Sequence, residues 1–121
     1  MDSTTTTVVL RYRDGRTERA ALIETDVDRQ IVRVSRDDGA NDDVPFSTLK
    51  AIFFPRSADQ ALEEPAGSTI AVEFADGEVI RGVAQYNPER NGFFLYPLDR
   101  SKNDRIFVVN SAIVSIEVEK L

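Results

Sequence analysis

The tightest constraint in this sequence is a hairpin signal that occurs twice, 62 residues apart. Asp14-Gly15 and Asp76-Gly77 each follow a run in which apolar and polar residues alternate. An Asp-Gly pair between alternating runs is among the best short hairpin signals, because the turn needs a backbone with positive φ. The alternating apolar residues are Val8, Leu10 and Tyr12 before the first turn and Ile70, Val72 and Phe74 before the second. The sequence therefore predicts a chain built from β-hairpins.

The match between the two parts of the chain extends beyond these turns. With the same shift of 62, Arg19 falls on Arg81 and the run QIVRVS falls on GFFLYP. A further shift of one or two residues matches VPFSTLKAIFF to FVVNSAIVSIEV. Identities are few, so the repeat rests on pattern and turn placement. The sequence predicts two copies of one β-unit.

Each unit is predicted to contain five short strands. Five strands in about 50 residues, with Gly82 marking a strand bend, favour a small closed barrel over a flat sheet. Units of this size bury too little surface to be comfortably stable alone, so we expect the two to pack together. The expected fold is all-β, with two tandem SH3/Sm-like barrels and one short linker helix that a capping-box pattern, Ser57 with Gln60, would begin. The expected organisation is a flexible tail at 1–6, a first β-barrel unit at 7–56, a linker at 57–68 and a second β-barrel unit at 69–121.

The run VEFADGEVIRGVAQYNPERNGFFLYP resembles the first motif of the Sm-like small-barrel family. Gly82, Tyr86, Asn87 and Asn91 stand at the motif's glycine, aromatic and amide positions. The resemblance implies a small barrel and, in that family, RNA binding aided by an arginine of the second motif. Here Asn110-Ser111 stands at the place of that Arg-Gly pair, and this departure disfavours RNA. The chain is also similar to uncharacterised tandem domains found beside receiver and PilZ modules, which implies a bacterial signalling context.

Charge and composition exclude several classes of function. The net charge is −6 and no segment is basic, whereas proteins that hold phosphate backbones usually carry a basic face. The chain has no cysteine, histidine or tryptophan, which removes disulfides, thiolate and histidine catalysis and Cys/His zinc sites. No GxSxG motif and no phosphate-binding glycine loop is present. We therefore expect no enzyme activity, cofactor or metal. The opening run MDSTTTTVVL has no positive n-region or long apolar stretch, so we expect no membrane association and a cytoplasmic location.

The loop Asn87–Gly92 (NPERNG) is the most distinctive polar segment. One interpretation makes Asn87, Arg90 and Asn91 a recognition edge. The other is that asparagine, proline and glycine simply build the turn between two strands.

Two apolar runs, Phe93–Tyr96 and Ile106–Val109, break the period of two. A strand with one wet face should alternate, so both faces of these strands are expected to be covered. Matching GFFLYP to QIVRVS places Phe94 and Tyr96 inside the second barrel. This leaves Phe93, Leu95 and Phe107 on its outside, covered by the first unit, a second subunit or a partner.

Two other segments have spacings typical of ligand sites, but each departs from the motif it resembles. The acidic tip RDDGANDD could take calcium, but it lacks the ligand order and late glutamate of an EF-hand. Arg29 and Arg33 have the RxxxR spacing of cyclic-diguanylate clamps, but the companion glycine falls one residue too late.

The predicted function is a non-enzymatic interaction or regulatory module that binds another protein through an apolar face or strand edge of the second unit. The alternative is an Sm-like RNA-binding protein that uses the Asn87–Gly92 loop, and a small-ligand sensor ranks third. The sequence leaves a homo-oligomer open. The candidate binding residues are Asn87, Arg90, Asn91, Phe93, Leu95 and Phe107.

Overall fold

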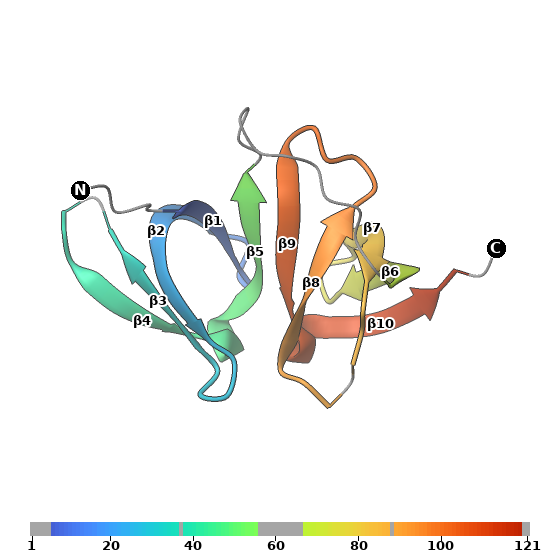
Figure 1. Cartoon of the computed structure of the whole chain (residues 1–121). Helices are drawn as coiled ribbons and strands as arrows, with labels where there is room; N and C mark the ends of the chain where they lie inside the picture. The colour runs from blue at the N-terminus through green and yellow to red at the C-terminus, as the bar shows by residue number, and fades with distance from the viewer. Residues whose placement is uncertain (1–5, 37, 56–66, 88, 120–121) are drawn as a thin grey trace.

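A computed structural model describes residues 6–36, 38–55, 67–87 and 89–119, and β-strands dominate them (Figure 1). The first half contains β1 (Thr6–Tyr12), β2 (Thr17–Asp26), β3 (Ile31–Ser35), β4 (Asn41–Pro45), the 3-10 turn η1 (Phe46–Thr48) and β5 (Leu49–Pro55). The second half contains β6 (Ser68–Phe74), β7 (Val79–Ala84), β8 (Gly92–Pro97), β9 (Asn103–Val109), the 3-10 turn η2 (Asn110–Ala112) and β10 (Ile113–Val118). The prediction of an all-β protein is confirmed.

The ten strands form one antiparallel sheet in the order β10-β6-β7-β8-β9-β5-β1-β2-β3-β4. The prediction of two closed barrels is therefore wrong. The physical reason lies in the middle of the sheet, where β5 pairs with β1 on one side and with β9 on the other. To close into a barrel, each half would have to pair its two outer strands with each other. One outer strand of each half, β5 and β9, instead pairs with the other half. The linker helix predicted within 57–68 falls largely on residues 56–66, which lie outside the described residues, as do residues 1–5 of the predicted tail.

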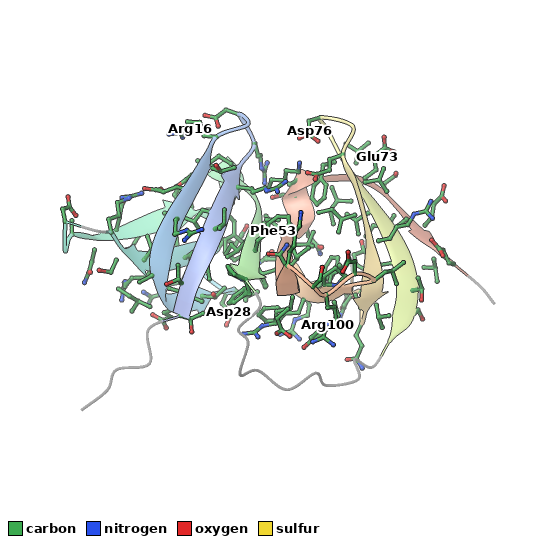
Figure 2. The ribbon with its side chains drawn as sticks, turned by 90° about the horizontal axis from the view of Figure 1, so that it is seen from above. Arg16, Asp28, Phe53, Glu73, Asp76 and Arg100 are labelled. Atoms are coloured by element: carbon green, nitrogen blue, oxygen red, sulfur yellow. The ribbon has the colours of Figure 1, made fainter. Side chains whose placement is uncertain are left out.

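The two halves repeat the same sequence of elements, with a 3-10 turn before the last strand of each. Asp14-Gly15 makes the β1–β2 turn and Asp76-Gly77 the β6–β7 turn, with glycine φ values of +96° and +89°. Figure 2 shows the two hairpin tips on the same side of the molecule, marked by Arg16 and Asp76. The equivalence predicted from the 62-residue shift is confirmed at these turns.

Each half gathers its buried side chains into a cluster of its own. Along β1 the side chains alternate between buried and partly exposed, so that Val8 and Leu10 are fully buried while Val9 is not. This is the expected result of a period-two pattern on a sheet with one core face. The first cluster includes Val8, Leu10, Val32, Val34 and Phe46, and the second includes Ile70, Val72, Phe74, Phe93 and Leu95.

The paired strands β5 and β9, called the seam below, run side by side at the centre of Figure 1. Their side chains enter both clusters: Leu49, Ile52, Phe54, Phe107 and Val109 belong to the first, and Ala51, Phe53, Ile106 and Val108 to the second. Figure 2 shows Phe53 between the two lobes. Each core is thus completed by a strand of the other half. The prediction that both faces of Ile106–Val109 are covered is confirmed, and the cover is the first half.

Candidate functional site

The second half buries two of the residues expected on its outside. Phe93 is 6% exposed and Leu95 is fully buried, and both belong to the second half's own cluster. Phe94 instead points outward and is 40% exposed. The prediction for these faces is wrong because β3 and β8 are related by a shift of 61 residues, not 62. Val32 pairs with Val44 in the first half, and Phe93 pairs with Val108 in the second, so Phe93 is the equivalent of Val32. A slip of one residue moves every side chain of a strand to the other face.

Phe107 does lie on the side of β9 that faces away from the second half's cluster. It is 3% exposed and packs in the first cluster, with its ring centroid 5.7 Å from that of Phe46 and 5.2 Å from that of Phe94. The first half covers it. Phe93, Leu95 and Phe107 therefore do not present their side chains at the surface.

The Asn87–Gly92 loop is held by hydrogen bonds within the chain. The Asn87 side chain accepts a bond from the Glu89 backbone N–H at 2.9 Å. The side chain of Asn110 donates to the backbone oxygens of Asn87 and Arg90. Asn91 Nδ2 donates to the Val27 backbone oxygen at 2.8 Å, which ties this loop to the β2–β3 turn of the first half. Asn87 and Asn91 thus build and anchor the turn, while the side chain of Arg90 is exposed.

A buried lysine at the seam was missed by the sequence reasoning. Lys50 is the extra residue of a bulge, because Arg11 pairs with Ala51 and Tyr12 with Leu49. Its side chain is 8% exposed, and its Nζ lies 2.7 Å from an Asp76 carboxylate oxygen. The available signal was a single cation inside the apolar run LKAIFF.

The second half surrounds this ammonium group. Nζ also donates to Glu78 and lies 4.9 Å from the centroid of the Phe74 ring. Arg11 donates to the same Glu78 at 3.2 Å and stacks over the Phe53 ring at 4.2 Å. Burial lowers the pKa of Lys50, but the hydrogen bonds to Asp76 and Glu78 outweigh it, so the pKa is raised. The hydrogen bond from Lys50 holds the pKa of Asp76 below its ordinary value.

This ion cluster should make stability depend on acidity. Because the folded pKa of Asp76 is depressed, its contribution is present above the unfolded pKa of about 3.9 and is lost as the pH falls through the folded value. We expect Lys50→Met to flatten the decline of the melting temperature below about pH 4. Melting curves between pH 7 and 2.5 measure this, with the exposed Lys102→Met as the matched control. Identical pH profiles for Lys50→Met and the unmodified chain would contradict it.

The sheet ends in two strands with very different edges, and the first is β10. Val114 is 62% and Val118 54% exposed, whereas the equivalent strand β5 is buried from Leu49 to Phe54. The Glu119 N–H donates to the Thr69 backbone oxygen on β6 at 2.8 Å. Since the direction of N–H groups alternates along a strand, those of Ile116 and Val118 point away from β6. In the described residues no strand pairs with that side of β10.

The second free edge is β4. It carries Asp42, Asp43 and Pro45, residue types that natural proteins place on edges to discourage unwanted pairing. Asp43 forms an ion pair with Arg33 at 2.9 Å. The β4 edge therefore carries charged side chains, whereas the β10 edge carries the exposed apolar side chains of Val114 and Val118.

A hollow of about 540 Å³ lies between the β1–β2 hairpin and β4. Arg36 bridges its walls, with its Nε 2.7 Å from Glu18 and its Nη1 2.5 Å from Asp42. The Tyr12 hydroxyl donates to Glu18 at 2.6 Å. The hydrogen bonds from Arg36 and Tyr12 lower the pKa of Glu18, while burial and the contact with Glu18 raise that of Tyr12.

These features define an all-β protein with one open, two-lobed sheet and two unlike strand edges. Residues 4–120 match the model of DUF6982, a family of unknown function, and the chain belongs to that family. No curated protein and no solved structure matches the chain. In the part of the chain that the structure describes, no helix is long and apolar enough to cross a membrane. Nor do the described residues bring together three or more acidic, histidine or cysteine side chains that could hold a metal ion.

Proposed function

We propose that this protein is a non-enzymatic interaction module that binds another protein by adding a partner strand to the edge of β10. The observation that carries the proposal is the open edge itself, where Val114 and Val118 lie exposed beside the half-buried Ile116. Strand addition gains affinity from main-chain hydrogen bonds and specificity from alternate side chains.

The seam supplies an internal example of such a complex. There β5, the equivalent of β10, pairs with β9 from Ala51 to Pro55 and is buried on both faces from Leu49 to Phe54. At β10 the same arrangement would cover Ile113 and Ile116, which already pack at the rim of the second cluster. A partner strand with the apolar character of β9 suits this edge, because it would extend that cluster.

The resemblance of each half to the Sm-like small barrels is part of the proposal. It is supported by the five strands of each half and by the 3-10 turn that precedes the last strand in both. The RNA-binding alternative gains no support from the loop Asn87–Gly92, whose asparagine side chains bond within the chain.

Val118→Pro tests the proposal, because it removes an N–H that points to the open side and spares those that bond to β6. The probe is a labelled peptide that copies residues 102–110, the β9 segment, and binding to the full chain is read by fluorescence anisotropy. We expect Val118→Pro to weaken binding about tenfold or more, since it removes one hydrogen bond and crowds the docked strand. Val118→Thr, which keeps the N–H and the branched side chain, should bind as the unmodified chain does.

Two results would overturn the proposal. One is a peptide that binds Val118→Pro and the unmodified chain equally well. The other is a gel shift on pooled RNA that is tighter, at physiological salt, than the nonspecific range of about 10⁻⁴ to 10⁻⁶ M. The second result would favour the RNA-binding alternative.

A further inference from the structure

Both halves contain a site for a cation, and the two sites are filled in different ways. In the second half Lys50, which comes from the neighbouring strand β5, lies over the Phe74 ring and bonds to Asp76. In the first half the guanidinium of Arg16 lies 4.6 Å from the centroid of the Tyr12 ring, and its Nε lies 2.7 Å from Asp14.

The two sites are equivalent in the sheet. Tyr12 pairs with Leu49 and Phe74 with Ile113, in each case where the register shifts at a bulge in the last strand of the half. Asp14 and Asp76 occupy the same place in their hairpin turns. The chain's own Arg16 therefore fills the position that a docked strand fills in the second half.

Arg16 can be displaced at little cost. Its side chain is 69% exposed and that of Asp14 57%, whereas that of Lys50 is 8% exposed. Exposed ion pairs contribute little to stability, so an incoming cation competes with a weak contact.

The backbone of β4 is suited to accept a strand beside this site. The Phe46 N–H donates to the Gln30 backbone oxygen, so the N–H groups of Asn41 and Asp43 point to the open side. In β9 the equivalent residues are Arg105 and Phe107, and their N–H groups point toward β5 across the seam. Pro45, which has no N–H, corresponds to Val109, and the pairing of β9 with β5 already ends at Val108.

The chemistry of the hollow differs from that of its counterpart. Ile80 and Ile106, which share the second cluster with Phe53, are replaced in the first half by Glu18 and Asp42. Asp43 stands in the place of Phe107. Among the described residues, this surface offers four carboxylates, Asp14 included, and three arginines (Arg16, Arg33 and Arg36) lie among them. A strand docked here would meet acidic side chains where β5 meets apolar ones.

We propose that the β4 edge and its hollow bind an extended basic segment of another protein. The segment pairs antiparallel to β4, and one lysine or arginine displaces Arg16 from the Tyr12 ring and from Asp14. This surface is separate from β10 and selects opposite chemistry, because β10 offers an apolar edge.

The probe is a labelled peptide that copies residues 48–55 with Ile52→Lys and Phe53→Lys, titrated into the full chain at low salt. We expect Arg16→Ala to strengthen binding several-fold, because it removes the internal competitor. Arg19→Ala is the matched control, since it removes the same charge from an exposed position on β2 and should leave binding nearly unchanged. Asp43→Lys should weaken binding about tenfold or more, with melting temperatures confirming that each variant is folded.

Further arms identify where the peptide binds. A peptide that also carries Lys50→Glu should lose binding, and NMR shifts should change at Asn41 and Asp43. Equal effects of Arg16→Ala and Arg19→Ala would overturn the inference, because they would show a general response to charge. So would a failure of the basic peptide to bind. Loss of its binding in Val118→Pro would place the peptide at β10, which overturns this inference and leaves the proposed function standing.

Discussion

Replacing Phe107 by alanine should lower the free energy of unfolding by about 3–5 kcal/mol, the usual cost of truncating a buried phenylalanine. The ring is 3% exposed and lies against Phe46 and Phe94, in a cluster that belongs to the other half of the chain. A loss of this size is a large part of the 5–15 kcal/mol that stabilises a typical domain. Urea unfolding followed by circular dichroism measures it.

Phe94→Ala is the control for this prediction. Phe94 is the neighbouring aromatic and pairs opposite Phe107, but its side chain is 40% exposed. It should therefore lose less than half as much stability as Phe107→Ala. Equal losses in the two variants would show that burial at the seam does not govern the stability of this strand.

The second large effect is expected when the two halves are made as separate chains, residues 1–66 and 67–121. Without β9 the first half loses Phe107 and Val109 from its cluster, and without β5 the second half loses Ala51 and Phe53. Chains of about 60 residues are already marginal, so each piece alone should lack a dispersed NMR spectrum.

Mixing the two pieces should restore the spectrum of the intact chain, because the seam needs no covalent link between β5 and β9. A well-dispersed spectrum from either piece alone would instead show that the half folds without its neighbour.

The parts of this fold that sequence could predict are the local ones. The turns at Asp14-Gly15 and Asp76-Gly77, the alternation along β1 and the repeated order of strands all depend on residues close in the chain. The joining of the halves depends on pairing between residues 51–55 and 103–108. No local pattern encodes which of several apolar strands will meet, so an open sheet could not be distinguished from two closed barrels.

The prediction of the candidate binding residues was wrong for a more specific reason. The assignment of Phe93 and Leu95 depended on an alignment that was wrong by one residue, which is enough to exchange the two faces of a strand. The role of Lys50 was hidden because its partners, Asp76 and Glu78, lie in the other half. The edges of β10 and β4 became visible as candidates only once the strand order was known.

The exchange of side chains across the seam also bears on how the protein is made. β5 is complete when Pro55 has been added, but β9, which buries it, follows roughly 50 residues later in the chain. At about 5–20 residues per second the ribosome needs several seconds to supply it. During that interval the apolar strand Leu49–Phe54 has no partner on its second edge. An unpaired apolar edge of this kind favours aggregation of the nascent first half.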